Sequence, residues 1–433
     1  MAAGHSVNPD RWLGGIDDLL GRVAGHVGRV EPRKRMRQFV FAMMAGLPRT
    51  NCWSIAEHAG ERCPRGMQRF LSEAVWDQDA VLDDVRAWVV EHLGDPEAVL
   101  VIDETGDVKK GTRTVGVQRQ YTGTAGRIEN SQVAVYLTYA SSKGHALIGR
   151  SLYLPVVWTD DPDRLGEAGV PDDVVFATKP ALAKKLILDA LDAQTPARWA
   201  AGDEVYGGDP KLRKALHKRG VGYVLAIAKN HQISTGIGSR RAIDLAVRLR
   251  PHCWNRISAG RGAKGERWYD WALIDTTDPA AGQDGHHWLL IRRNRKTGEY
   301  AFYRAWSPTP VPLSTLVKVA GRRWTIEESF AASKELAALD EHQVRIWTSW
   351  QRWTVLAILA HAFLSVMAAT EPLPQTGTAL IRLTRNEIRR LLALALQPAH
   401  DVLHALHWST WRRTHQARAH TSHIQRQLII EPN

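Results

Sequence analysis

Three pairs of neighbouring acidic residues stand at positions where they could carry out chemistry. Two of the pairs come directly after short apolar runs that are typical of buried strands, and the third opens a segment with helical spacing. A carboxylate at the end of a strand lies at the edge of a sheet, where ligand crevices form. The pairs are Asp103 and Glu104, Asp203 and Glu204, and Glu327 and Glu328.

Carboxylates from three separate segments can share one site only if their pKa values rise or a cation neutralises them. Two divalent ions about 3.5–4 Å apart, held by Asp and Glu oxygens, can activate a water or a 3′-hydroxyl and stabilise the leaving oxygen of a phosphodiester. Mg²⁺ suits such a site because it prefers oxygen ligands. A single acid of this kind is more often a turn residue or a helix cap. We therefore base the prediction of a catalytic metal site on Asp103, Asp203 and Glu327 together.

The segment around Glu327 allows two interpretations. If it is one helix, Arg323, Glu327 and Lys334 lie along the same face, where two cations flank a carboxylate beside bound phosphates. Alternatively, Thr325 and Glu328 form a capping box, which assigns Glu328 to the backbone and places Arg323 outside the regular helix. Both interpretations favour Glu327 as the metal ligand.

The first 95 residues have the apolar spacing of helices. Within them, a short helix, a break at Gly60 and a second helix opening at Pro64 resemble a helix-turn-helix, although two short helices joined by glycine also occur in plain bundles. The second helix would present three side chains to a DNA groove, namely Arg65, Gln68 and Arg69. A preceding basic cluster is also predicted to bind DNA and consists of Arg33, Lys34 and Arg35.

After residue 95 the pattern becomes that of a mixed α/β domain. The run Val99–Ile102 predicts a buried strand that ends at Asp103, and a hairpin meander follows as far as residue 154. A strand–helix–strand unit then precedes a stretch of short aromatic-rich runs, at residues 251–312, that predicts an all-β insertion. Helices resume at residue 313. Their longest apolar run, Val355–Ala369, is shorter than the ~20 residues of a membrane span and predicts a buried helix.

The positive charge of the chain is concentrated in its second half. Of the net +12, residues 1–200 hold 24 basic and 26 acidic side chains, whereas residues 201–433 hold 33 and 19. This asymmetry indicates a polyanionic partner such as nucleic acid, although a basic surface can also serve solubility. A glycine-rich loop with Lys264 lacks the spacing of a nucleotide-binding loop, and we assign it to DNA.

The cysteines and the N-terminus bear on the class of protein. Three cysteines make neither a disulfide framework nor a zinc ribbon, and the first residues lack the apolar core of a secretory signal. We therefore expect a cytoplasmic protein without a membrane partner.

The sequence blocks around the three acids also form a recognisable set. They are Val-Ile-Asp103-Glu104-Thr105, Ala-Gly-Asp203-Glu204-Val-Tyr206-Gly and Arg322-Arg323-Trp324-Thr-Ile-Glu327. Four further stretches belong with them, at residues 123–132, 153–155, 176–180 and 339–345. Together these blocks resemble the DDE transposases of bacterial insertion sequences, and the insertion-sequence 701 group most closely. The resemblance extends from about residue 30 to residue 420.

The resemblance implies an α/β fold with an RNase H-like mixed-sheet catalytic core that is interrupted by a β-rich insertion. It places a helical domain before the core and helices after it. The expected units are a helical DNA-binding domain (1–95), the first part of the core (96–250), the β-rich insertion (251–312), the core helix with the catalytic Glu (313–371) and a basic helical C-terminal region (372–433).

The resemblance also implies metal-dependent DNA cleavage and strand transfer at terminal inverted repeats. Asp103, Asp203 and Glu327 match the ligands of two Mg²⁺ ions, for which Mn²⁺ would substitute. Arg323 and Lys334 match the basic residues of the related Tyr-x2-Arg-x3-Glu-x6-Lys signature, whereas Ala320 stands where the Tyr is expected. The implied partners are double-stranded DNA, at element ends and target, and a second copy of the chain in a synaptic homodimer. The alternatives are a non-catalytic DNA-binding regulator and a metal-dependent nuclease without joining activity.

Overall fold

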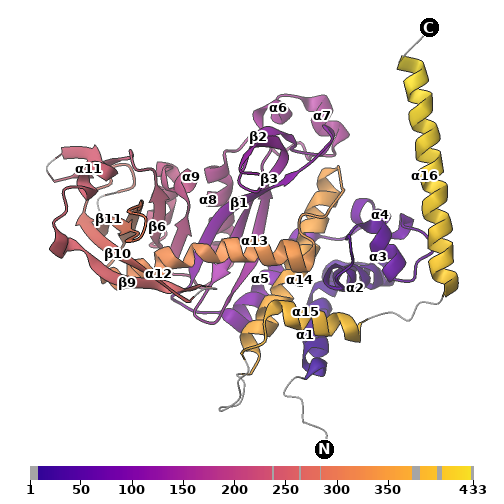
Figure 1. Cartoon of the computed structure of the whole chain (residues 1–433), viewed down its shortest axis with the longest axis horizontal. Coiled ribbons are helices and arrows are strands. Elements are labelled where there is room, and N and C mark those ends of the chain that lie inside the picture. The colour runs from indigo at the N-terminus through magenta and orange to yellow at the C-terminus, as the bar shows by residue number, and fades with distance from the viewer. Residues whose placement is uncertain are drawn as a thin grey trace, which may run out of the picture.

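The computed structural model describes residues 8–236, 238–262, 265–282, 284–372, 381–396 and 402–430. Figure 1 shows the N-terminal helices grouped at one side of a large sheet, with the orange helices α12 and α13 running across that sheet. The fold is therefore a mixed α/β fold, as the sequence predicts.

Five helices form the N-terminal region, as their apolar spacing predicts. Asn8, Asn51 and Asp77 each cap one of them by accepting hydrogen bonds from backbone N–H groups of the first turn. The predicted break is confirmed at Gly60, whose φ of 78° suits glycine. The helices are α1 (Pro9–Val23), α2 (Val30–Met44), α3 (Cys52–His58), α4 (Arg65–Ser72) and α5 (Gln78–Leu93), with the 3-10 turn η1 (Ala24–His26) after α1.

Ten strands form one mixed sheet in the order β2-β3-β1-β5-β6-β12-β11-β10-β9, with β4 paired to β3. The central strand β1 is antiparallel to β3 and parallel to β5, and β5 is parallel to β6. The strands are β1 (Val99–Val108), β2 (Gln118–Thr122), β3 (Arg127–Ala140), β4 (His145–Leu152), β5 (Trp199–Gly202), β6 (Gly222–Ile227), β9 (Asn255–Gly262), β10 (Gly265–Asp275), β11 (His286–Arg293) and β12 (Tyr300–Ser307).

The β-rich segment at residues 251–312 extends this same sheet, because β12 pairs antiparallel with β6. A separate small hairpin consists of β7 (Gln232–Thr235) and β8 (Gly238–Arg241). The remaining helices are α6 (Val156–Thr159), α7 (Pro162–Glu167), α8 (Lys179–Asp192), α9 (Glu204–Gly207), α10 (Pro210–Lys218), α11 (Ala242–Ala246), the turn η2 (Pro251–Cys253), α12 (Leu313–Arg322), α13 (Trp324–Ala337), α14 (Trp347–Thr370), α15 (Arg385–Ala395) and α16 (Val402–Ile430).

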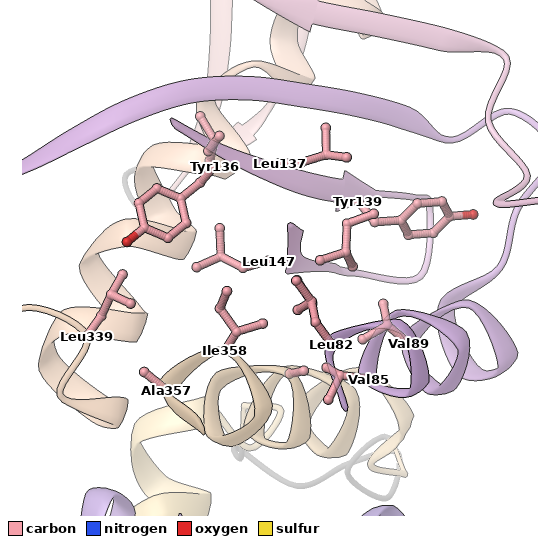
Figure 2. Packing of buried hydrophobic residues seen from close by; sticks show 14 of the residues in the cluster. Leu82, Val85, Val89, Tyr136, Leu137, Tyr139, Leu147, Leu339, Ala357 and Ile358 are labelled. Carbon is pink, nitrogen blue, oxygen red and sulfur yellow. The ribbon is translucent and has the colours of Figure 1, made fainter. Parts of the chain in front are cut away.

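Helix α14 is the centre of the hydrophobic core. Figure 2 shows Ala357 and Ile358 of α14 beside α5 and beneath β3 and β4, with Leu147 between the strands and α14 and the ring of Tyr139 pointing sideways; all four side chains are fully buried. Burial of each large apolar side chain stabilises the fold by about 1.5–3 kcal/mol. Among the described residues, only α14 is long and apolar enough to cross a membrane, and 83% of its apolar stretch is buried inside the protein. The predicted buried helix is thus confirmed.

Two local predictions are wrong. β1 does not end at Asp103 but continues to Val108, since its antiparallel partner β3 pairs with it along the whole length, as far as Ser131. The capping box is absent as well. The Thr325 hydroxyl donates to the Arg322 carbonyl oxygen (2.7 Å), and the carboxylate of Glu328 pairs with an imidazole of β4. Arg323 has helical backbone angles and joins α12 to α13, so the one-face interpretation holds.

A buried ion pair ties the β-rich segment to α10. The Nε of Arg213 donates to Oδ2 of Asp278 over 2.7 Å, and both side chains are 4% exposed; Arg304 of β12 approaches the same oxygen to 3.6 Å. We expect Asp278→Ala to lower the free energy of unfolding by about 3–5 kcal/mol, because Arg213 would remain buried without a counter-charge. Urea denaturation at pH 7 measures this. The exposed acid Asp275 at the end of β10 is the matched control, and Asp275→Ala is expected to change stability by less than about 0.5 kcal/mol. Equal stability of the two variants would contradict the prediction.

Asp278 also makes stability depend on pH. Burial alone would raise its pKa, but the hydrogen bond from Arg213 and the charges of Arg213 and Arg304 outweigh burial and hold the pKa below its usual range. A carboxyl group with a lowered folded-state pKa stabilises the fold above its unfolded pKa of about 3.9, and this contribution is lost as the pH falls through the folded value. Between about pH 6 and pH 3, the wild type should therefore lose more thermal stability than Asp278→Ala. Parallel melting profiles of the two proteins would show that the pair does not titrate in this way.

Candidate active site

Asp103 and Asp203 directly follow two residues that pair in the sheet. In the parallel pairing of β1 with β5, Ile102 is in register with Gly202, and each of these residues is followed by an aspartate. Asp203 is the N-cap of the short helix α9, and its carboxylate accepts the Val205 N–H over 2.9 Å. The local backbone thus holds the Asp203 carboxylate at the first turn of α9.

Burial and neighbouring carboxylates raise the pKa values of both aspartates. Burial, and then the charges of Asp203 and Glu104, raise the pKa of Asp103 to about 8. Burial and the charge of Glu104 likewise raise the pKa of Asp203 to about 6. Like charges that are buried together disfavour the ionised forms, so this pair holds two negative charges only beside a cation.

Arg323 supplies positive charge between the first and third acids. Its guanidinium lies 3.7 Å from Oδ2 of Asp103, through Nη1, and 2.9 Å from Oε1 of Glu327, through Nη2. It also acts on Asp203, where its charge partly offsets the rise in pKa. Arg323 therefore links Asp103 to Glu327, and its charge also reaches Asp203.

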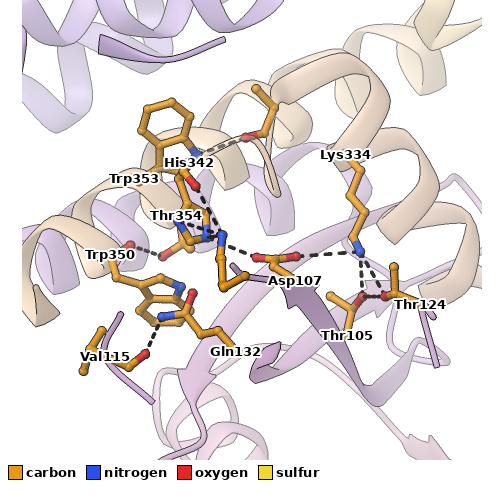
Figure 3. A network of polar contacts seen from close by, with 12 residues as sticks. Thr105, Asp107, Val115, Thr124, Gln132, Lys334, His342, Trp350, Trp353 and Thr354 are labelled. Carbon is orange, nitrogen blue, oxygen red and sulfur yellow. Dashed lines mark hydrogen bonds and ion pairs between the residues drawn. The ribbon is translucent and has the colours of Figure 1, made fainter. Parts of the chain in front are cut away.

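Lys334 lies further along α13 and faces the polar half of β1. Its Nζ donates to the hydroxyl of Thr105 over 2.9 Å and lies 3.9 Å from the carboxylate of Asp107. Figure 3 shows that Asp107 stands between Lys334 and the ring of His342; the distance from His342 Nε2 to Asp107 Oδ2 is 3.0 Å. Burial would raise the pKa of Asp107, but the hydrogen bond with His342 and the nearby lysines hold it below its usual range. The carboxylate thereby fixes Lys334 beside the strand.

A second polar cluster includes the neighbour of Asp103. Because side chains alternate along a strand, Glu104 points to the face opposite Asp103. There it accepts a hydrogen bond from Lys179 Nζ (2.7 Å) and a short one from the Tyr206 hydroxyl. Sequence reasoning missed these partners, as it missed Asp107. The available signal was position, since Lys179 and Tyr206 stand in two of the blocks that carry the family resemblance.

The donor set fits a hard divalent cation. Asp103, Asp203 and Glu327 offer only carboxylate oxygens, and burial raises the pKa values of the two aspartates, so a cation bound there would displace protons or the guanidinium. In the described part of the chain, no three His, Cys, Asp or Glu side chains stand close enough to hold a metal ion as they are. Arg323 stands between Asp103 and Glu327 instead.

The DNA-binding residues predicted in the N-terminal helices lie apart from the carboxylates. Arg33 and Lys34 are exposed at the start of α2, and the second helix of the predicted helix-turn-helix exposes Arg65, Gln68 and Arg69. Arg69 pairs with Glu73 (2.7 Å). Arg35 is different, because its side chain is 16% exposed and pairs with both Glu31 and Glu61. Lys264 lies outside the described residues.

A pocket of about 1200 Å³ also lies in the N-terminal region. It is lined by Arg29, Arg35, Arg69 and Arg352 among others, and none of the three carboxylates contributes to it. We place the chemistry at the carboxylates, because volume alone supplies no reacting group.

Comparisons with known proteins show what this chain is similar to. A family model described as DDE superfamily endonuclease matches residues 22–235, and one described as transposase DDE domain matches residues 177–363. A probable transposase for insertion sequence element IS701 from Microchaete diplosiphon is 27% identical over 280 residues, which cover 61% of this chain and 69% of that protein. The structure of a piggyBac transposase synaptic complex with hairpin DNA is similar at a TM-score of 0.42 and 10% identity, over 90% of this chain and 80% of that one.

The two family models together span the segments of Asp103, Asp203 and Glu327, and the predicted resemblance is confirmed. By its endonuclease and transposase domains and its relation to an insertion-sequence protein, the chain belongs to the DDE transposases.

Proposed function

We propose that the protein binds the terminal inverted repeats of its own element, cleaves DNA there in a metal-dependent reaction, and joins the ends to target DNA. The observation that carries this proposal is the adjacency of Asp103 and Asp203, with Glu327 facing them across Arg323. Two neighbouring carboxylates with raised pKa values, linked through Arg323 to a third, suit divalent-metal phosphodiester chemistry.

We further propose that the core is RNase H-like. Its support is the order of the five strands around the site, in which β1 is central, β3 and β4 lie on its antiparallel side, and β5 and β6 lie on its parallel side. In this proposal residues 96–250 form the first part of the core, 251–312 an insertion and 313–371 the part with the catalytic Glu. Residues 1–95 and 372–433 are the DNA-binding helical domain and the basic C-terminal region.

Asp103, Asp203 and Glu327 would hold two Mg²⁺ ions, with Mn²⁺ as a substitute. When bound, the ions would supply the activation of a water or 3′-hydroxyl and the stabilisation of the leaving oxygen. The residues of this chain prepare the site. Without a cation, Arg323 pairs with the carboxylates of Asp103 and Glu327. When a cation binds these carboxylates, Arg323 would be released to pair with a phosphate of the DNA. Lys334, held by Thr105 and Asp107, presents a second positive charge along the same helix.

DNA recognition is proposed for the N-terminal helices and the C-terminal helix α16. The exposed residues of the N-terminal part are Arg33, Lys34, Arg65, Gln68 and Arg69. Helix α16 is anchored to the same region, because the Trp408 indole donates to the Glu61 carbonyl oxygen over 2.8 Å, and it carries exposed Arg413 and Arg418 beyond that contact. We leave Arg35 out, since two glutamates already neutralise it. The acting form is proposed to be a homodimer in a cytoplasmic, nucleoid-associated synaptic complex.

Removing any of the three carboxylates should abolish cleavage but leave DNA binding intact. We expect Asp103→Ala, Asp203→Ala and Glu327→Ala to cut a labelled duplex of the DNA flanking the gene at least about a thousandfold more slowly than the wild type, since the residues act as one unit. Glu204→Ala and Glu328→Ala are matched controls, each removing the acid next to a proposed ligand. Full cleavage by Glu327→Ala together with an inactive Glu328→Ala would refute the assignment of the third ligand.

A strand-transfer assay with pre-cut ends separates a transposase from a nuclease without joining activity. The wild type should insert pre-cut ends into a plasmid in the presence of Mg²⁺. Cleavage without insertion would support the nuclease. Binding with neither reaction would support a regulator, against which the complete set of three carboxylates argues.

Metal binding should be visible without any reaction. At about 100 times its dissociation constant, Mg²⁺ should stabilise the wild type by about 2.7 kcal/mol, a shift that thermal denaturation in EDTA and in Mg²⁺ would measure. Asp103→Ala and Asp203→Ala should lose the shift, whereas Glu204→Ala should keep it. In EDTA the two Asp variants should be at least as stable as the wild type, because they no longer bury mutually repelling carboxylates. An equal Mg²⁺ shift in all variants would place the metal elsewhere.

A further inference from the structure

A basic groove lies at the end of β1 that is remote from Asp103. It has a volume of about 720 Å³ and is lined by five cationic side chains, namely Arg49, Lys109, Lys110, Arg113 and Arg345. The two carboxylates in its lining belong to Asp340 and Glu341. The groove therefore carries an excess of positive charge.

Most of this positive charge is uncompensated. Arg49, Lys110, Arg113 and Arg345 are exposed, and none of them forms an ion pair with any carboxylate in the described part of the chain. The carboxylate of Glu341 is engaged, since it accepts the backbone N–H of Thr50. An anion in the groove would therefore meet free guanidinium and ammonium groups.

The walls of the groove are held in place by hydrogen bonds. The Asn130 side chain donates to the carbonyl oxygens of Lys109 (2.6 Å) and Gly111 (3.0 Å), and the Val115 N–H donates to the Arg345 carbonyl oxygen (2.9 Å). These contacts come from the stretches at residues 123–132 and 339–345, which carry the family resemblance and contain none of the three proposed metal ligands. Both stretches thus hold the backbone of the segments that carry the basic side chains of the groove.

The groove is in line with the carboxylate site. Val108, at its edge, is five residues beyond Asp103 on β1, which corresponds to about 17 Å, or about five base pairs of duplex DNA. Lys334 stands between the two places, at Thr105. A DNA backbone that leaves Asp103 along β1 would pass Lys334 and enter the groove.

The other end of the groove leads to the predicted recognition helix. Gln343 lines both the groove and an adjoining pocket of about 230 Å³, which Gln68 of α4 also lines. Arg49 stands just before α3, where its carbonyl oxygen accepts the Ser54 hydroxyl. The groove thus lies between the carboxylates and α4.

We propose that this groove binds the sugar–phosphate backbone of duplex DNA about five base pairs from the bond that is cleaved, with Arg113 and Arg345 as its main phosphate contacts. The inference rests on the proposed function and adds to it the path of the DNA between the metal site and α4. Arg113 and Arg345 are singled out because both also line the adjoining pocket of about 500 Å³, so they stand at the junction of two hollows.

The test is the salt dependence of DNA binding by the full chain in EDTA, where no cleavage occurs. The probe is a random-sequence 40-base-pair duplex, titrated at several NaCl concentrations. For Arg113→Ala/Arg345→Ala, the slope of log affinity against log salt should decrease in magnitude by about two, with weaker binding at each salt concentration. Arg113→Lys/Arg345→Lys should restore the slope, because a lysine still pairs with phosphate.

The matched control is Arg240→Ala/Arg248→Ala, which removes two exposed arginines from the region of β8 and α11 at the other end of the sheet (Figure 1). Its slope should equal that of the wild type. An unchanged slope for Arg113→Ala/Arg345→Ala would overturn the proposal. If this variant instead bound the duplex normally but no longer bound polyglutamate, the groove would be assigned to an acidic protein segment. Because binding is measured without metal, a failure of cleavage in the wild type would contradict the proposed function and leave this result unaffected.

Discussion

The parallel register of β1 with β5 is the constraint on which the site depends. It sets Ile102 beside Gly202, so that Asp103 and Asp203 directly follow neighbouring residues of the two strands. Burial and neighbouring carboxylates raise the pKa values of both aspartates, so positive charge is favoured at this point of the sheet. The guanidinium of Arg323 supplies positive charge here, and a divalent cation would supply more of it.

The helices after the β-rich segment place a positive charge beside these carboxylates. Helix α12 packs on β9, β5 and β6, and α13 continues past β1, so their junction carries Arg323 to the carboxylates. One turn later, Glu327 points back at the same guanidinium. Helix α14 then fixes α13 from behind while it packs on α5 and β4. The buried core thus determines the position of the third acid, although that acid is remote in sequence from the other two.

The parts of this arrangement that sequence could predict are those encoded locally. The apolar run before Asp103 predicts β1, and the largely apolar run at residues 355–369 of α14 predicts its burial. The incorrect predictions concern residues whose local structure depends on a partner that is remote in the sequence. The polar residues after Asp103 disfavour a strand, yet pairing with β3 carries β1 on to Val108. Likewise, Glu328 meets the spacing of a capping box, but His145 from β4 takes its carboxylate. The residues next to Asp103 and Glu328 in the sequence give no indication of pairing with β3 or with His145.

The extension of β1 has its own electrostatic consequence. It carries Asp107 into the interior, where a buried carboxylate would be costly without partners. His342 and Lys109 supply them, and His342 belongs to the segment that closes the basic groove. The same residues that neutralise the polar half of the strand therefore also bring Arg345 to the groove. Asp107 also lies 3.9 Å from Lys334. The buried carboxylate of Asp107 therefore helps to position Lys334 on one side and Lys109 on the other. A strand that ended at Asp103 would leave the metal site without this line of positive charge.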